Sequence, residues 1–375
     1  MKAEGLDRIV RAEDVAHMGI TEVIRHMPRV YRSYRRLVSS IKARRPNAAV
    51  LIDFPDVNLR LARELKALNI PVIYFVSPQL WAWKRRRLQW VQQRVDRMMV
   101  IFPFEERFYR ARGVNATFVG HPLTELPFPS STREEYAAKY NLDPARPWIA
   151  LLPGSRSKEI GANLPVMLDA AARLSPGGGC EFLLPVASTL DAKWVVEQAT
   201  PWMAERQHSS LPLVSNLHMV DEAREALFHA RASAVASGTA TVQAAVIGNP
   251  FIVVYRVSPV TFAAAKQLVR YPAEIPAQPD AFGNLPIGMV NLIAGRRVVP
   301  ELIQQQFTAD KVAVELRTLL DDTPERFQMI ADLAEVREKL LSPVTSGSIA
   351  QVAQAVLGVL SAPSPSIGRN EVQSV

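Results

Sequence analysis

The chain has 375 residues, of which 48% are hydrophobic and 21% charged, as expected for a globular protein long enough for two domains. A single cysteine, Cys180, excludes a disulfide framework, and no apolar run approaches the roughly 18 residues of a membrane-spanning helix. The net charge is +8, but residues 1–120 hold 23 Lys and Arg against 11 Asp and Glu, so this basic third favours an anionic partner.

The N-terminal residues lack the apolar core of a signal peptide, so a reducing cytosol is the expected compartment. Residues 17–45 keep apolar side chains at helical spacing among eight Lys and Arg, and Pro28 is predicted to split this stretch into two helices. The apolar stripe either packs on a sheet or contacts an anionic membrane surface. No nucleic-acid-binding module is recognisable, so no nucleic-acid partner is predicted.

Short apolar runs alternate with helical patterns along the rest of the chain. Strands are predicted at 48–52, 72–76, 98–102, 117–119, 148–152, 181–184, 211–214, 232–236 and 251–255. Such alternation is typical of an α/β fold with parallel sheets covered on both faces. Nine strands are many for one sheet of this kind, so we expect two doubly wound, Rossmann-like domains that face each other across a cleft at the carboxyl ends of their strands.

The domain boundary is expected in a Pro- and Ser-rich seam at 127–147. The first domain would cover 1–140 and the second 141–345. A helix at 346–360 is expected to pack back toward the first domain, and the polar tail at 361–375 to be disordered.

Asp53 follows the strand predicted at 48–52, and Asp56 lies three residues later. A carboxylate at a strand end that faces a cleft is a candidate general base, so Asp53 is predicted to be the catalytic base. Asp56 fits better as the N-cap of a helix predicted at 58–68.

Ser77, Trp81 and Trp83 follow the next strand, directly before Lys84 and three arginines. Two tryptophans beside four basic residues are typical of an apolar surface that attracts anions, as at a membrane interface. The alternative is that the tryptophans are core residues and the basic residues begin a solvated helix.

His121 lies in the loop after the strand at 117–119 and faces the seam, where it is either a catalytic acid or substrate ligand, or a structural histidine. The other histidines show no metal-ligand spacing, and no metal site is predicted.

Two strand-to-helix turns suggest a phosphate site. The strand at 148–152 runs into Pro153-Gly154-Ser155-Arg156, where Ser155 is the expected N-cap and Arg156 can bind an anion. The strand at 232–236 runs into Ser237-Gly238-Thr239, and Gln243 lies about one helical turn after Thr239. Hydroxyls, free N–H groups and an arginine suit a nucleotide diphosphate, and Gln243 is placed to reach a ribose. No dinucleotide fingerprint, P-loop or Asp-x-Asp pair occurs, so no cofactor or metal is predicted.

In this order, the motifs closely resemble those of lipid-A-disaccharide synthases, glycosyltransferases of the two-domain GT-B fold. The matching segments are 18–23, 52–58, 74–83, 118–123, 151–156, 236–240 and 291–296.

The resemblance implies an inverting transfer of sugar from UDP-2,3-diacylglucosamine to the 6-hydroxyl of 2,3-diacylglucosamine 1-phosphate, which forms the β-1,6 lipid A disaccharide 1-phosphate and releases UDP. It implies that Asp53 is the base and that Ser155, Arg156, Ser237, Gly238 and Thr239 bind UDP. Ser77, Trp81, Trp83 and Asn291 would line the substrate site. Because both substrates are acylated, the enzyme is expected to associate with anionic phospholipid at the inner face of the cytoplasmic membrane.

Three departures from the family pattern stand out. Met1–Gly5 corresponds to an internal segment of typical members, so the family's first strand, acidic glycine-rich loop and first helix are expected to be missing. Gln243 stands where members usually have a glutamate, and the segment 271–288 is longer than usual. The alternatives are another UDP-sugar enzyme, such as a UDP-N-acetylglucosamine epimerase or a peptidoglycan glycosyltransferase, or a remnant that binds UDP and lipid without turnover.

Overall fold

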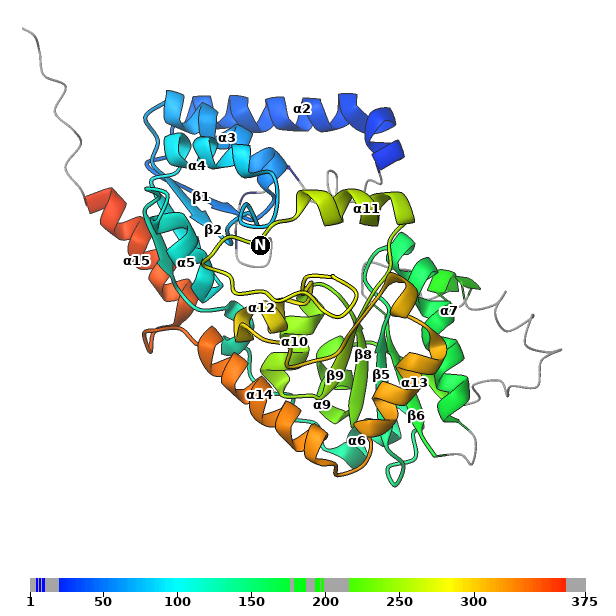
Figure 1. Ribbon diagram of the computed structural model, residues 1–375. Coiled ribbons are helices and arrows are strands. Elements are labelled where there is room, and N and C mark those ends of the chain that lie inside the picture. Colours follow the sequence, from blue (N-terminus) through cyan, green and yellow to red (C-terminus); the bar gives the residue numbers. More distant parts are fainter. Residues whose placement is uncertain are drawn as a thin grey trace, which may run out of the picture.

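Two parallel β-sheets, each covered by helices, make up the computed structural model (Figure 1). It describes residues 5, 7, 9–10, 20–175, 179–186, 193–195, 197–198 and 216–361, with the backbone alone at 20–27 and 29. The predicted α/β class is confirmed. The strand predicted at 211–214 lies outside the described residues.

The first sheet has the strand order β1-β2-β3-β4, with every neighbouring pair parallel. Its strands are β1 (Ala49–Ile52), β2 (Val72–Phe75), β3 (Arg97–Val100) and β4 (Ala116–Phe118). The connecting helices are α3 (Pro55–Ala67), α4 (Leu88–Arg94, after the short η2 at Arg85–Arg87) and α5 (Pro103–Arg110). β2 is buried along its length, whereas β1 forms an edge on which Val50 and Ile52 are exposed.

The second sheet has the order β10-β9-β8-β5-β6-β7 and is also parallel throughout. Its strands are β5 (Trp148–Leu152), β6 (Glu181–Pro185), β7 (Leu217–Val220), β8 (Ala232–Ala236), β9 (Phe251–Tyr255) and β10 (Glu301–Ile303). β5 and β8 are central and buried at every residue, as their continuous apolar sequences predict. The sequence patterns did not predict β7 and β10, which are the two edge strands.

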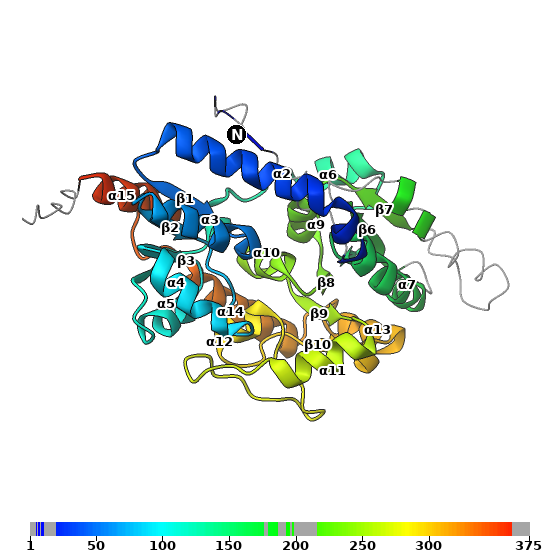
Figure 2. The ribbon, with the colours of Figure 1, turned by 90° about the horizontal axis from the view of Figure 1, so that it is seen from above.

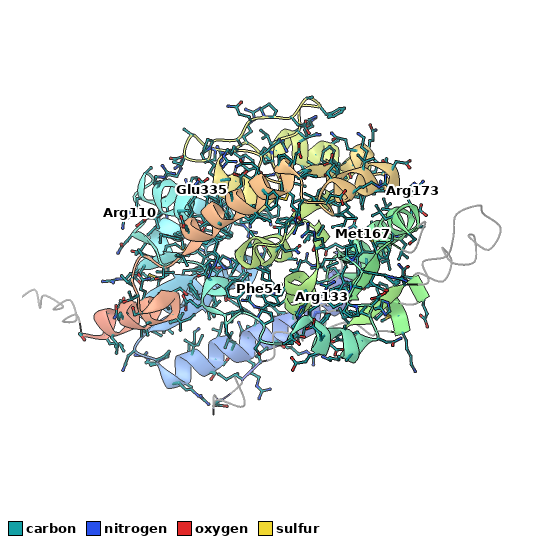
Figure 3. The ribbon with its side chains drawn as sticks, turned by 90° about the horizontal axis from the view of Figure 1, so that it is seen from below. Phe54, Arg110, Arg133, Met167, Arg173 and Glu335 are labelled. Atoms are coloured by element: carbon teal, nitrogen blue, oxygen red, sulfur yellow. The ribbon has the colours of Figure 1, made fainter. Side chains whose placement is uncertain are left out.

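Helices cover both faces of the second sheet. They are α7 (Ser157–Leu174), α9 (Ala223–His229), α10 (Thr239–Ile247), α12 (Met289–Ala294), α13 (Ala309–Thr318, after η4 at Gln304–Gln306) and α14 (Pro324–Leu340). α11 (Pro259–Leu268) has no buried residue and lies toward the first half (Figure 1). α7 illustrates the packing: Met167 is fully buried, while Arg173 on the same helix forms an ion pair with Asp310 of α13 at 2.6 Å (Figure 3).

α2 (Ile20–Arg44) runs along the outside of α3 as one helix (Figures 1 and 2). The prediction that Pro28 splits it is therefore wrong. A proline removes one intrahelical hydrogen bond, and a helix of 25 residues can lose that bond and continue. Val38, on the described part of α2, is buried against the first sheet's core.

The chain returns to the first sheet after completing the second. The segment between the sheets holds η3 (Pro122–Glu125) and α6 (Arg133–Tyr140), and α14 leads into α15 (Gly347–Ser361). α15 contacts β2 and η3, and Gln351 Nε2 donates to the Val119 carbonyl oxygen at 2.9 Å (Figure 1). At the same place His121 N donates to the Leu340 carbonyl oxygen at 2.8 Å, so one backbone and one side-chain hydrogen bond join this return segment to the end of the first sheet.

Candidate functional site

The two predicted phosphate-binding turns lie side by side in the structure. β5 and β8 are adjacent parallel strands, with Leu152 opposite Val235, so the turns that follow them leave the same edge of the sheet. β5 also pairs with β6 on its other side, which makes this edge the point where the strand order reverses. Ligands of open α/β sheets bind at such a switch point.

A cavity of about 500 Å³, here called the polar pocket, lies between these turns. All six residues predicted to bind UDP line it: Ser155, Arg156, Ser237, Gly238, Thr239 and Gln243. The end of β6 and the segment 221–224 complete its wall. No sequence motif marks this second contribution, because these residues lie outside both turns.

Arg156 is held at the rim of the polar pocket. Its Nη1 pairs with Glu159 Oε1 at 2.7 Å, while Glu159 Oε2 accepts from Ser155 N at 3.2 Å, and the arginine side chain remains 81% exposed. Gly154 has a φ of +126°, and a Cβ there would lie 2.7 Å from Glu159. The turn therefore needs glycine. Ser155 is not the N-cap as predicted: α7 begins at Ser157 with Arg156 at the N-cap position, because the turn takes one more residue.

The N-terminus of α10 faces the same pocket. Gly238 occupies its N-cap with a φ of 154°, no side chain caps the first turn, and Thr239 and Ala240 line the pocket. The uncapped N–H groups and the helix dipole suit an anion there. Gln243 reaches the same pocket from one turn further along α10.

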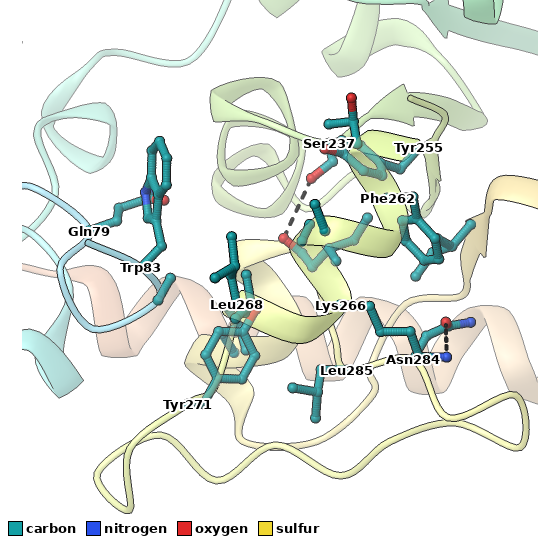
Figure 4. A pocket seen from close by; sticks show the side chains of 18 of the residues that line it. Gln79, Trp83, Ser237, Tyr255, Phe262, Lys266, Leu268, Tyr271, Asn284 and Leu285 are labelled. Carbon is teal, nitrogen blue, oxygen red and sulfur yellow. Dashed lines mark hydrogen bonds between the residues drawn. The ribbon is translucent and has the colours of Figure 1, made fainter. Parts of the chain in front are cut away.

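A second cavity of about 790 Å³, here called the apolar pocket, adjoins the polar pocket and shares Ser237 with it (Figure 4). One side is the loop 79–83 of the first half, and the other is α11 with the segment 283–292 of the second half. In Figure 4, Gln79 and Trp83 face Leu268 and Tyr271 across the pocket. The sequence motifs did not indicate α11, because its apolar residues form no recognisable binding motif.

The two tryptophans of the loop differ in environment. Trp81 is 2% exposed and lines the apolar pocket, while its Nε1 donates to Glu105 Oε1 at 3.0 Å. Trp83 also lines the pocket but is half exposed, with Lys84 Nζ 4.1 Å from the centre of its ring. Trp81 is therefore a core residue, as one alternative predicted, whereas a membrane-facing role for the exposed Trp83 stays a prediction.

Glu105 supports this loop from beneath and was not singled out from the sequence. It is fully buried, and its Oε2 accepts from Phe102 N at 3.2 Å. Burial raises the pKa of Glu105 to about 7, and the hydrogen bonds from Trp81 and Phe102 only partly offset this effect. Ser77 is also buried and lines neither described pocket, so its place in the substrate lining stays a prediction.

Asp53 lies at the carboxyl end of β1 with an exposed side chain. Its backbone is fixed in the left-handed region, with a φ of 46°, and its carbonyl oxygen accepts from Tyr74 Oη at 2.6 Å and from Asn58 Nδ2 at 2.7 Å. The main chain is thus held while the carboxylate remains accessible to solvent.

Asp56 is not the N-cap that the sequence predicted. α3 begins earlier, at Pro55, because a proline is favourable in the first turn, and Phe54 occupies the N-cap. Asp56 forms ion pairs with Arg87 and, at 3.7 Å, with Lys84, and these cations lower its pKa although burial opposes the change.

His121 is 6% exposed and lines neither described pocket. Its Nδ1 accepts from Leu123 N at 3.1 Å, and burial lowers the pKa of the ring to about 4. A neutral, enclosed imidazole that caps η3 fits the structural alternative, and the catalytic role of His121 stays a prediction.

Asn291, which the resemblance placed in the substrate site, lines neither described pocket. It is 1% exposed and all its hydrogen-bonding capacity is used inside the protein. Its Oδ1 accepts from Val298 N and Val299 N, and its Nδ2 donates to the Val299 carbonyl oxygen and to Glu301 Oε1 at 2.8 Å. Its neighbours Met289 and Leu292 line the apolar pocket instead, because the helix turns them to the other face.

Within the described residues, no group of three metal-ligating side chains comes together, and none of the helices is both long and apolar enough to cross a bilayer.

Comparison with known proteins places the chain in a family. A family profile described as "Lipid-A-disaccharide synthetase" matches residues 1–356. Lipid-A-disaccharide synthase of Acidobacterium capsulatum is 53% identical over 358 residues, which are 94% of this chain and 85% of the relative.

Solved structures show the same fold at much lower identity. S. aureus MnaA, in a co-structure with UDP, superposes with a TM-score of 0.57 at 12% identity, covering 88% of this chain and 79% of the other. A calicheamicin glycosyltransferase superposes with a TM-score of 0.51 at 15% identity, covering 91% and 83%. These matches show a GT-B fold, and the sequence match shows that the chain belongs to the lipid-A-disaccharide synthetase family.

Proposed function

We propose that this hexosyltransferase transfers the sugar of UDP-2,3-diacylglucosamine to the 6-hydroxyl of 2,3-diacylglucosamine 1-phosphate, with lipid A disaccharide 1-phosphate and UDP as products. One observation carries the proposal: six residues from two distant turns line a single polar pocket at the switch point of the second sheet. A site with these groups is suited to a diphosphate.

The diphosphate binds in the polar pocket and leaves from it. The free N–H groups at the start of α10 and the guanidinium of Arg156 stabilise the negative charge that develops on UDP. A bound diphosphate replaces Glu159 as the partner of Arg156. Gln243 bonds the ribose with an uncharged amide that both donates and accepts.

Asp53 removes the proton from the acceptor hydroxyl. Inversion at the anomeric carbon requires one base on the face opposite the leaving group, and an exposed carboxylate on a fixed main chain meets this need. The acceptor oxygen then forms the new bond to the anomeric carbon as the bond to the diphosphate breaks.

The basic first third brings the enzyme to the inner face of the cytoplasmic membrane. Trp83 is half exposed beside Lys84 and the arginines of η2, which combines an apolar side chain with several positive charges. Anionic phospholipid attracts such a surface, and both acylated substrates reside in that membrane.

The test compares a variant of Asp53 with a variant of Asp56. Asp53→Asn should lower disaccharide formation by about 10²- to 10⁴-fold, because the general base is lost, while UDP binds as before. Asp56→Asn is the matched control, since Asp56 lies three residues further on, in the first turn of α3, and is ion-paired. Full activity of Asp53→Asn would remove Asp53 as the base. Equal turnover of unacylated UDP-glucosamine by the native enzyme would favour an enzyme of unacylated UDP-sugars instead.

A further inference from the structure

The apolar pocket has room for a long hydrocarbon chain. Its volume of about 790 Å³ corresponds to on the order of two dozen groups the size of a methylene, each comparable to a water molecule. Its wall is mostly aliphatic and aromatic, with contributions from Trp81, Trp83, Phe262, Leu268, Leu285 and Leu292 among others. A pocket of this kind takes an apolar ligand.

Most polar side chains of the wall are bonded to the protein. Tyr271 Oη donates to the Pro286 carbonyl oxygen at 2.7 Å, and Ser237 Oγ donates to that of Ile287 at 3.4 Å (Figure 4). Trp81 directs its N–H to Glu105, and Lys266 Nζ lies 3.3 Å from the Phe282 carbonyl oxygen. Few polar groups in the wall are therefore left to bind a polar ligand.

Ser237 lines both pockets, so the apolar pocket opens beside the diphosphate rather than at a separate place. A ligand that fills both must carry hydrocarbon close to its diphosphate. Of the two proposed substrates, only the UDP-linked sugar carries both acyl chains and a diphosphate. We propose that the apolar pocket holds an acyl chain of the donor and that α11 limits the length of this chain. The inference rests on the proposed function and deepens it.

Ala264 and Ala265 are the small residues of α11 that line the pocket. A larger side chain at Ala265 would occupy space that the chain end needs, and leucine adds three carbons without weakening the helix. Ala263 lies on the same helix, is exposed and does not line the pocket. Ala263→Leu is therefore a matched control that adds the same side chain outside the pocket.

The experiment measures kcat/KM and equilibrium binding for UDP-diacylglucosamines with acyl chains of graded length, in mixed micelles of constant composition. Each methylene that Ala265→Leu excludes should lower kcat/KM about fourfold, so the preferred donor should become about three carbons shorter. Ala263→Leu should keep the native preference, and UDP itself should bind all three proteins equally.

Three results would overturn the inference: an unchanged length preference in Ala265→Leu, an equal change in Ala263→Leu, or a change seen only when the acceptor chain is varied. If the native enzyme does not transfer sugar from any of these donors, the proposed function fails. The equilibrium binding measurements still decide whether the pocket holds an acyl chain.

Discussion

Glu105 makes the stability of the first half depend on pH in a way that one substitution should remove. The carboxyl group is fully buried under the loop 79–83, and burial raises its pKa from 4.5 to about 7. In the unfolded chain it ionises near its ordinary value. Between pH 4.5 and pH 7 the folded state therefore holds one proton more than the unfolded state, and the free energy of unfolding falls as the pH rises.

The size of the effect follows from the shift. Each unit of pKa difference corresponds to about 1.4 kcal/mol, so this carboxyl should contribute on the order of 3 kcal/mol that is fully present below pH 4.5 and lost by about pH 7. Glu105→Gln keeps the shape and an acceptor for Trp81 but has no proton to lose. The substitution itself destabilises the protein, because the new amide N–H faces Phe102 N, but this destabilisation is the same at every pH.

The assay is urea unfolding of both proteins at several pH values from 5 to 8. Hydrogen exchange of peptides from β2 and β3 assigns the transition to the first half. The difference between native protein and Glu105→Gln should change by a few kcal/mol across this range, in favour of the native protein at low pH. Parallel pH profiles for the two proteins would refute the reasoning, because they would mean that Glu105 binds the same number of protons folded and unfolded.

Two further predictions concern Asn291 and the membrane. Asn291→Ala should destabilise the second half by on the order of 3 kcal/mol while UDP affinity is retained, because it leaves Val298 N and Val299 N without a partner and removes one of several donors to Glu301. Urea unfolding and UDP titration measure the two effects, and lost turnover at unchanged stability would return Asn291 to the substrate site. The protein should co-sediment with vesicles of anionic phospholipid but not with neutral vesicles. Salt near 1 M should release it, because the Debye length is then about 3 Å. Vesicle binding that does not change with salt would contradict electrostatic docking.

The sequence predicted the elements whose signals are local. Continuous apolar runs marked the central strands β5 and β8, and glycine-containing turns after them marked the polar pocket. Edge strands such as β10 escaped prediction, since three residues do not form a pattern. Helix starts were misplaced by one to three residues at Ser157 and Pro55, because the cap depends on how the turn enters the helix.

Two candidate residues lie in places that the sequence did not predict. Asn291 was assigned by the family resemblance and His121 by its place on a loop, yet both are enclosed and hold the backbone in place. A polar residue that bonds its own backbone and one that bonds a ligand can look alike in a sequence. Only the direction of the side chain separates them.

The sequence by itself determined the α/β class, the family and the two turns that suit a diphosphate, since apolar periodicity, turn residues and motif order are written along the chain. Tertiary structure alone decided that these turns share one pocket, that Trp81 is buried while Trp83 is half exposed, and that α11 and the loop 79–83 enclose an apolar pocket beside Ser237. These features arise where segments far apart in the chain meet. The pairing of β5 with β8 and the packing of the two halves, rather than any local preference, bring them together.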